Sequence, residues 1–131
     1  MSQQDVATVR SGYEAFNRKD IPAVLDLFDP QIEWIEPGGG RAPAGTFHGL
    51  QSVANDVFAA VPQKFDDFRV DPEQFIDAGE NVVAVGRFRG KAKSGATLDA
   101  PFVHVYRFRN GKTVHFQNYV AAAPWASAWG G

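Results

Sequence analysis

The sequence predicts an α+β fold in which helices pack on one face of a curved, mostly antiparallel sheet. The first half of the chain carries three segments with the helical spacing of apolar residues, and one stranded segment between them. The second half carries stranded segments joined by short turns that contain glycine or asparagine. The 131 residues suit a single domain, residues 1–131, with no internal repeat and no linker.

The helices are predicted from spacing and from capping residues. A first helix is expected near residues 3–18, where apolar side chains recur every three or four positions. These side chains are Val6, Val9, Tyr13 and Phe16. Asp20 is a favourable N-cap for a short second helix, which ends before Pro30. A third helix with a clear amphipathic pattern is expected from residue 50 to Pro62.

Stranded segments account for the remainder of the chain. Residues 32–36 are predicted as the first strand, followed over 37–45 by a loop rich in glycine, proline and alanine. Everything after residue 65 is expected to be stranded, in segments 68–77, 82–89, 98–109 and 113–122. Pro72 predicts a kink, a bulge or a sheet edge in the first of these segments. Asn110 and Gly111 predict a tight hairpin between the last two.

The composition excludes several classes of protein. The absence of cysteine rules out disulfides and thiolate metal sites. Thirteen Lys and Arg residues against 15 Asp and Glu give a net charge of −2 without a basic tract, so we expect no nucleic-acid partner. No apolar run approaches the roughly 20 residues that a membrane span needs, and the start of the chain does not resemble a signal peptide. We therefore expect a cytoplasmic protein that does not bind membranes.

Aromatic residues are more numerous than a small core requires. Phe, Trp and Tyr together number 17 of the 131 residues. Such a surplus favours either a cavity lined by aromatic rings or an apolar interface. Trp125 and Trp129, near the end of the chain, are expected either to cover the opening of such a cavity or to lie in a dimer interface.

Glu36 is the most informative polar residue, because it ends an apolar strand just before a Pro-Gly turn. Alternate side chains of a strand share a face, so Ile32, Trp34 and Glu36 point to the same side. A carboxylate at the end of an apolar wall loses water, which raises its pKa and suits it to proton transfer near neutral pH. The alternative is a solvated glutamate that ends the strand and contributes only solubility.

Three elements of the chain resemble the SnoaL-like branch of the NTF2-like superfamily, which also contains the ketosteroid isomerases. They are the segment YEAFNRKD at 13–20, the strand and turn WIEPG at 34–38, and the hairpin HVYRFRNGK at 104–112. The resemblance extends over about residues 6–125 and rests on the order and spacing of the three elements. It implies an NTF2-like cone, in which a strongly curved sheet and three N-terminal helices enclose an apolar pocket. It also implies a homodimer formed through the outer face of the sheet.

The resemblance assigns roles to individual positions. Glu36 occupies the place of the proton-transferring acid of ketosteroid isomerases, where this chain has Glu instead of Asp. Tyr13 lies one position from the family's catalytic tyrosine, and Val103 matches the place of its second, protonated acid. In the polyketide cyclases of the family, the strand that matches 116–121 usually finishes in Asp, and this chain has Ala121 there. The acid or base that those enzymes use is therefore missing.

Other candidate residues follow from strand alternation. Asn118 and Tyr119 lie on opposite faces of their strand, and Asn118 is favoured for the pocket because it shares a face with Phe116. His104 is either a structural or interfacial residue or a member of the pocket. The three histidines are far apart and lack metal-binding spacing, so we expect neither a metal nor a cofactor.

Two hypotheses for function remain open. The first is an isomerase, cyclase or lyase in which Glu36 moves a proton on an apolar, carbonyl-type substrate, while Tyr13, His104 or Asn118 stabilises the developing negative charge. The expected ligand-binding residues are Phe16, Trp34, Phe58, Val103, Phe116 and Asn118. The second is a non-catalytic ligand-binding or dimerisation module with the same cavity, in which Glu36 lies at the rim.

Overall fold

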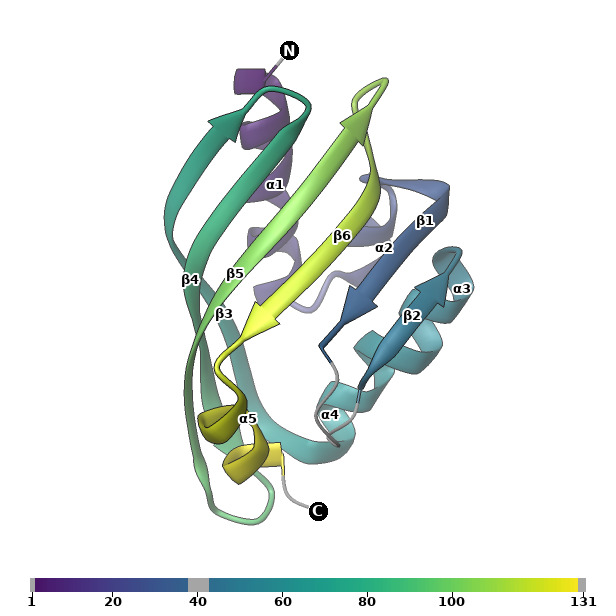
Figure 1. Cartoon of the computed structure of the whole chain (residues 1–131). Helices are drawn as coiled ribbons and strands as arrows, with labels where there is room; N and C mark the ends of the chain where they lie inside the picture. The colour runs from purple at the N-terminus through teal and green to yellow at the C-terminus, as the bar shows by residue number, and fades with distance from the viewer. Residues whose placement is uncertain (1, 38–42, 130–131) are drawn as a thin grey trace.

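A computed structural model describes residues 2–37 and 43–129 of the chain. A curved six-stranded sheet, with strand order β2-β1-β6-β5-β4-β3, forms one layer (Figure 1). The strands are β1 (Phe28–Glu36), β2 (Gly45–His48), β3 (Phe65–Ala78), β4 (Asn81–Ala92), β5 (Thr97–Arg109) and β6 (Lys112–Val120). Neighbouring strands are antiparallel except β1 and β6, which are parallel. The predicted α+β fold with a mostly antiparallel sheet is thus confirmed.

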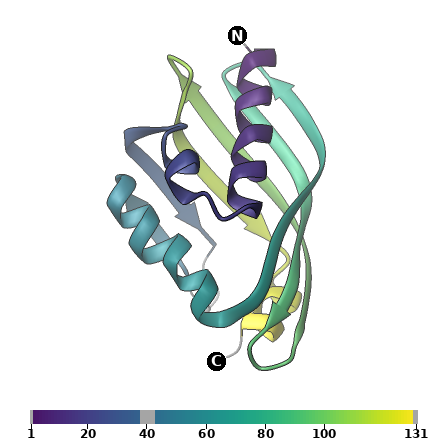
Figure 2. The same ribbon diagram turned by 180° about the vertical axis from the view of Figure 1, so that it is seen from behind.

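Helices lie against the concave face of this sheet, as the view from behind shows (Figure 2). They are α1 (Ser2–Asn17), α2 (Ile21–Leu25), α3 (Leu50–Ser52) and α4 (Val61–Lys64), and a further helix, α5 (Ala122–Trp129), follows β6. Asp20 caps α2 as predicted, since its side chain accepts a hydrogen bond from the backbone N–H of Ala23 at 3.2 Å. None of the helices within the described residues is long and apolar enough to cross a membrane.

The third predicted helix exists, but its pitch changes along its length. A π-helical turn (Val53–Val57) and a 3₁₀ turn (Phe58–Ala60) separate α3 from α4. The helical path also runs two residues past Pro62, where we expected it to end. A proline in the first turn of a helix removes no hydrogen bond that the helix needs, so α4 begins around Pro62 and continues to Lys64.

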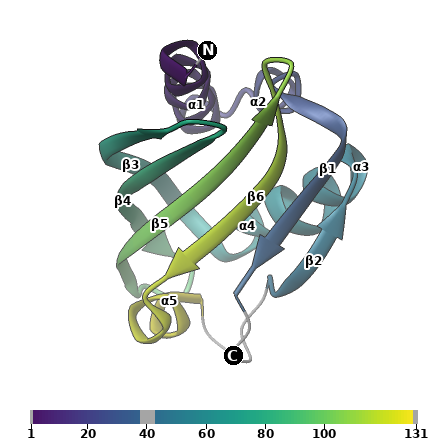
Figure 3. The same ribbon diagram turned by 45° about the horizontal axis from the view of Figure 1, so that its top comes forward.

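A glycine in β4 allows the close approach of β3. Gly86 pairs with Pro72 of β3, beside a register shift between Pro72 and Gln74. A Cβ atom at Gly86 would lie 2.4 Å from the carbonyl oxygen of Asp71 and 2.9 Å from the Phe102 ring, so a side chain there has no room. The bulge predicted from Pro72 is confirmed, and it lies in an edge strand. The sheet curls around the helices at this edge (Figure 3).

Two elements were not expected from the sequence. Strand β2 pairs with β1 at the end of the predicted loop over 37–45, most of which lies outside the described residues. Helix α5 occupies the end of the chain, where residues up to 122 were expected to be stranded. Trp125 and Trp129 lie four positions apart on α5, so both rings face the same side and pack on Phe65. That contact with a distant strand holds α5 against the sheet, and it cannot be read from neighbouring residues in the sequence.

Candidate functional site

A cavity lies between the helices and the concave face of the sheet. Its volume is about 90 Å³, several times the roughly 10–15 Å³ that one water molecule needs. Aromatic side chains form much of the wall, among them Tyr13, Phe16, Trp34, Phe58, Phe88 and Phe116. The surplus of aromatic residues therefore lines a hollow interior, and the protein does not fill the cone with its own side chains.

Glu36 points into this cavity from the end of β1. The alternation of β1 buries Ile32, Trp34 and Glu36 on one face, as the sequence predicted, and Glu36 is only 8% exposed. Trp34 Nε1 donates to Glu36 Oε2 at 2.5 Å, and Asn118 Nδ2 donates to Oε1 at 2.9 Å. Asn118 reaches the carboxyl from β6, the parallel neighbour of β1, because Trp34 is in register with Phe116. The carboxyl thus has one donor on each oxygen.

Burial and hydrogen bonding shift the pKa of Glu36 in opposite directions. Removal from water disfavours the charged carboxylate and raises the pKa of Glu36 to about 7, although the donors Asn118 and Trp34 lower it. The carboxyl therefore exchanges a proton within the neutral pH range. A group with a pKa near the working pH is suited to general acid and base chemistry.

His104 lies inside the protein, on β5 directly across from Asn118 of β6. Its Nδ1 is 2.7 Å from the hydroxyl of Tyr13, and its ring stacks on Phe102 at 3.8 Å between centroids. Burial lowers the pKa of His104 to about 3, so the imidazole is neutral at physiological pH. His104 is buried and lines the cavity, so its ring is within the part of the chain that surrounds a ligand.

Two tyrosines extend this line of polar groups. Tyr13 comes from α1, where its position among Val9 and Phe16 turns it towards the sheet, and Tyr106 follows His104 by two positions on β5. Burial raises the pKa of both phenols, and each acts on the pKa of the other, so their hydroxyls lie near one another. Tyr106 was missed as a site residue in the sequence analysis, although strand alternation places it on the same face as His104.

Most predicted ligand-binding residues line the cavity, and one does not. Phe16, Trp34, Phe58, Phe116 and Asn118 all contribute to its wall. Val103 is 36% exposed on the outer face of the sheet, so its placement in the pocket was wrong. The reason is strand alternation, because Val103 adjoins His104 and must point the opposite way.

The same alternation on β6 separates Asn118 from Tyr119. Asn118 is 3% exposed and Tyr119 is 56% exposed, which agrees with the prediction that Asn118 is the one that faces the pocket.

Trp125 of α5 also lines the cavity. It lines the wall and packs on Phe68 and Phe88, with ring centroids 6.1 and 5.2 Å away. Trp129 stacks behind it at 5.4 Å. Trp125 therefore contributes to the cavity wall, and Trp129 lies behind it.

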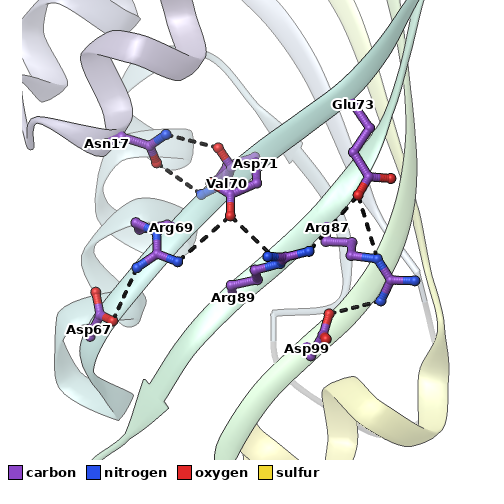
Figure 4. A network of polar contacts seen from close by, with 9 residues as sticks. All are labelled: Asn17, Asp67, Arg69, Val70, Asp71, Glu73, Arg87, Arg89 and Asp99. Carbon is purple, nitrogen blue, oxygen red and sulfur yellow. Dashed lines mark hydrogen bonds and ion pairs between the residues drawn. The ribbon is translucent and has the colours of Figure 1, made fainter.

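On the outer face of the sheet, the described residues form a network of ion pairs and no comparable cavity. Arg87 and Arg89 project from β4 among Asp71, Glu73 and Asp99, which pair with them (Figure 4). Guanidinium groups already paired with carboxylates do not form an anion site. Within residues 2–37 and 43–129, no cluster of histidine and acidic residues could hold a metal ion.

Comparisons with known proteins agree with this architecture. The family model of the SnoaL-like domain matches residues 9–116. An NTF2-like protein of unknown function from Burkholderia pseudomallei is 35% identical, with 98% of each chain covered and a TM-score of 0.90. TerC, co-crystallised with polyporic acid, is 25% identical over 95% of this chain and 97% of its own, with a TM-score of 0.87.

A more distant structure shares the fold alone. A putative SnoaL-like polyketide cyclase from Jannaschia is 18% identical, over 98% of this chain and 92% of its own, with a TM-score of 0.82. Among curated proteins, no sequence matches this chain.

Proposed function

This chain belongs to the SnoaL-like domain family, and we propose that it is a cofactor-independent enzyme of the isomerase, cyclase or lyase type. Glu36 transfers a proton on an apolar, carbonyl-type substrate held in the aromatic cavity. The observation that carries this proposal is a carboxyl group buried in an apolar cavity, with a donor on each oxygen and a pKa of about 7. A buried acid is costly for stability, so its retention here is most simply explained by chemistry.

The proposed reaction begins at a carbon next to the substrate's carbonyl group. The Glu36 carboxylate accepts the proton of that carbon, the electron pair of the broken C–H bond forms a carbon–carbon double bond, and the π pair of the carbonyl group moves onto its oxygen. The protonated Glu36 then returns the proton to the same carbon or to another one. The aromatic wall excludes water and holds the flat, apolar body of the substrate.

A relative supports the idea of a small-molecule ligand. TerC was crystallised with polyporic acid, and its chain superimposes on nearly all of this one. We infer that the corresponding cavity here also takes a small organic molecule.

The second candidate is a ligand-binding module without catalysis. Ala121 favours it, because cyclases of the family have an acid at the matching position. Ala121 here follows β6 and makes a backbone hydrogen bond to Pro101. The two candidates differ in what they require of Glu36, since a binding module needs no titrating carboxyl.

The test uses 2-tetralone, an aromatic ketone with acidic protons next to its carbonyl group. Wild-type protein in D₂O should accelerate exchange of these protons for deuterium, followed by NMR, and Glu36→Gln should reduce the rate by at least about 100-fold. Binding of 2-tetralone, measured by quenching of tryptophan fluorescence, should be retained in the variant. Equal exchange rates in the two proteins, or a Glu36 carboxyl that titrates near 4.5 in NMR, would exclude the enzyme.

We also propose that two copies associate through the outer face of the sheet. Val103 and Tyr119, which pair across β5 and β6, are exposed there at 36% and 56%. Exposed apolar side chains that lie side by side favour an interface.

A further inference from the structure

We propose that His104 is a positioning residue, which holds the side-chain amide of Asn118 in the orientation where its nitrogen, and not its oxygen, faces Glu36. This inference rests on the function proposed for Glu36, because the orientation matters for catalysis only if Glu36 must ionise to accept a proton. His104 then acts on the reaction through Asn118, without a contact to the reacting atoms.

The argument begins with Asn118, whose amide has two ends of opposite polarity. Its Nδ2 donates to Glu36 Oε1 at 2.9 Å, so its carbonyl oxygen Oδ1 points away from the carboxylate. An amide turned by half a rotation would direct Oδ1 at Glu36, and two oxygens with negative partial charge would then face each other. The orientation of one amide therefore decides whether Asn118 favours or disfavours the charged form of Glu36.

His104 is the residue that faces the other end of this amide. It pairs directly with Asn118 across β5 and β6. Nε2 of His104 and Oδ1 of Asn118 are both buried, and neither has a well-formed hydrogen bond to any described residue. The two side chains nevertheless interact, since a hydrogen bond with Asn118 raises the pKa of His104, as an acceptor does. The proton of the neutral ring therefore lies on Nε2, because the other tautomer would bury two facing lone pairs.

This tautomer extends the chain of hydrogen bonds to both tyrosines. With its proton on Nε2, His104 has only a lone pair on Nδ1, so the Tyr13 hydroxyl donates across their 2.7 Å contact. A further side-chain hydrogen bond joins Tyr13 and Tyr106, and Tyr106 must then be its donor. The resulting order of donors is Tyr106, Tyr13, His104 and Asn118, with Glu36 as the final acceptor. Hydrogen bonds arranged head to tail in this way polarise and strengthen one another.

Among the described residues of the cavity wall, no charged group competes with this chain. The titratable side chains that face Glu36 across the cavity are Tyr13 of α1 and, from β5, His104 and Tyr106. Burial raises the pKa of both phenols and lowers that of the imidazole, so all three are uncharged at pH 7. The pKa of Glu36 responds to burial and to two neutral donors, of which Asn118 has the larger effect. The direction of neutral dipoles is therefore what favours the carboxylate.

The test compares two substitutions of His104 that keep different parts of its contacts. His104→Phe keeps a ring that can stack on Phe102 but has no donor, whereas His104→Gln has an amide that can donate to Asn118 and accept from Tyr13. In His104→Phe the amide of Asn118 loses its fixed orientation, so the pKa of Glu36, followed by NMR, should rise from about 7 by at least about half a unit. In His104→Gln it should stay within about 0.2 units of the wild-type value.

Thermal melts of both variants check that the fold is intact. An unchanged pKa of Glu36 in His104→Phe would overturn the proposal. An equal rise in both variants contradicts it as well, because a general disturbance of packing would act in the same way on each.

A second background shows whether His104 acts through Asn118. Asn118→Leu keeps the approximate shape of the side chain and removes both of its polar ends, so the pKa of Glu36 should rise by about one unit. Adding His104→Phe to Asn118→Leu should then change this pKa by less than about 0.2 units. A further rise as large as that in the wild-type background means that His104 acts by another route, and the proposal fails.

The rate of 2-tetralone exchange links this inference to catalysis. A raised pKa leaves less carboxylate at neutral pH and the same amount at high pH. After subtraction of the uncatalysed rate, His104→Phe should therefore exchange at least about twofold more slowly than wild type at pH 7 and recover the wild-type rate near pH 9. A loss that persists at high pH contradicts the positioning role. Unimpaired exchange in Glu36→Gln contradicts the proposed function, whereas the NMR titrations still decide the role of His104.

Discussion

The two faces of strands β4 and β5 use polar residues in opposite ways. On the outer face, Arg87, Arg89 and Asp99 belong to a ladder of alternating charges that extends from β3 to β5 (Figure 4). On the inner face of β5, two positions apart, His104 and Tyr106 are surrounded by aromatic rings.

Exposure explains why the two sets behave differently. The side chains of the outer pairs are roughly one-third to one-half exposed, so water and salt screen them and their net contribution to stability is small. On the inner face, burial shifts the pKa of Glu36 and of His104 by large amounts in opposite directions. The pKa of a side chain in this fold therefore depends mainly on which face of the sheet it occupies, and the number of nearby charges matters little.

The largest expected effect is a loss of stability when a buried side chain on the inner face is truncated. Phe116 is 1% exposed and stacks on Trp34 at 3.8 Å, so Phe116→Ala should lower the free energy of unfolding by about 3–5 kcal/mol. The adjacent Gln117 points the other way, and Gln117→Ala should change it by less than about 0.5 kcal/mol. Urea unfolding of the two variants measures the difference. Similar losses would show that the two faces are not energetically distinct.

A smaller effect on the free energy of unfolding is expected when the pH is changed. The folded protein holds the Glu36 proton with a pKa of about 7 against 4.5 in the unfolded chain. Folding is therefore favoured below pH 4.5, and this advantage is lost as the pH rises from 4.5 through 7. Wild type should lose on the order of 3 kcal/mol relative to Glu36→Gln across that window, measured by urea unfolding at each pH.

The comparison with Glu36→Gln is needed because His104 acts in the opposite sense. Its pKa is lowered to about 3 in the folded state, so it destabilises the fold as the pH falls below 6.5. Subtracting the two unfolding curves removes this contribution, since both proteins contain His104, Tyr13 and Asn118. A difference that does not vary with pH would mean that Glu36 is not buried as an acid.

The smallest effect on folding is expected on the outer face. Val103→Lys places a charge on the proposed dimer surface without touching the cavity, so the mass measured by light scattering should fall from dimer to monomer. The far-UV circular dichroism spectrum should stay the same, because the side chain projects away from the core. A wild-type protein that is already monomeric, or a variant that remains dimeric, contradicts the proposed interface.

Some features of the site were predictable because they depend only on neighbouring residues. Strand periodicity placed Glu36 beside Trp34 and separated Asn118 from Tyr119. The same rule, applied to β5, should have placed Val103 outside and Tyr106 inside. The resemblance to a family position led to the wrong choice of Val103, and the periodicity of the chain itself was the better guide.

Other features involve partners that are distant in the sequence. Helix α5 forms where Trp125 and Trp129 meet Phe65, and strand β2 forms where it pairs with β1. Neither contact is made by residues that are adjacent in the sequence. Local patterns therefore missed both elements.

The sequence by itself determined the class of fold and placed Glu36 on the same strand face as Ile32 and Trp34, because hydrophobic periodicity and strand alternation are local properties. Only the tertiary structure decided that Asn118 meets Glu36 and that Tyr13 meets His104. These two contacts join residues 82 and 91 positions apart. A shifted pKa and a hydrogen-bond direction arise from such contacts and from the exclusion of water, which exist only once the chain has folded.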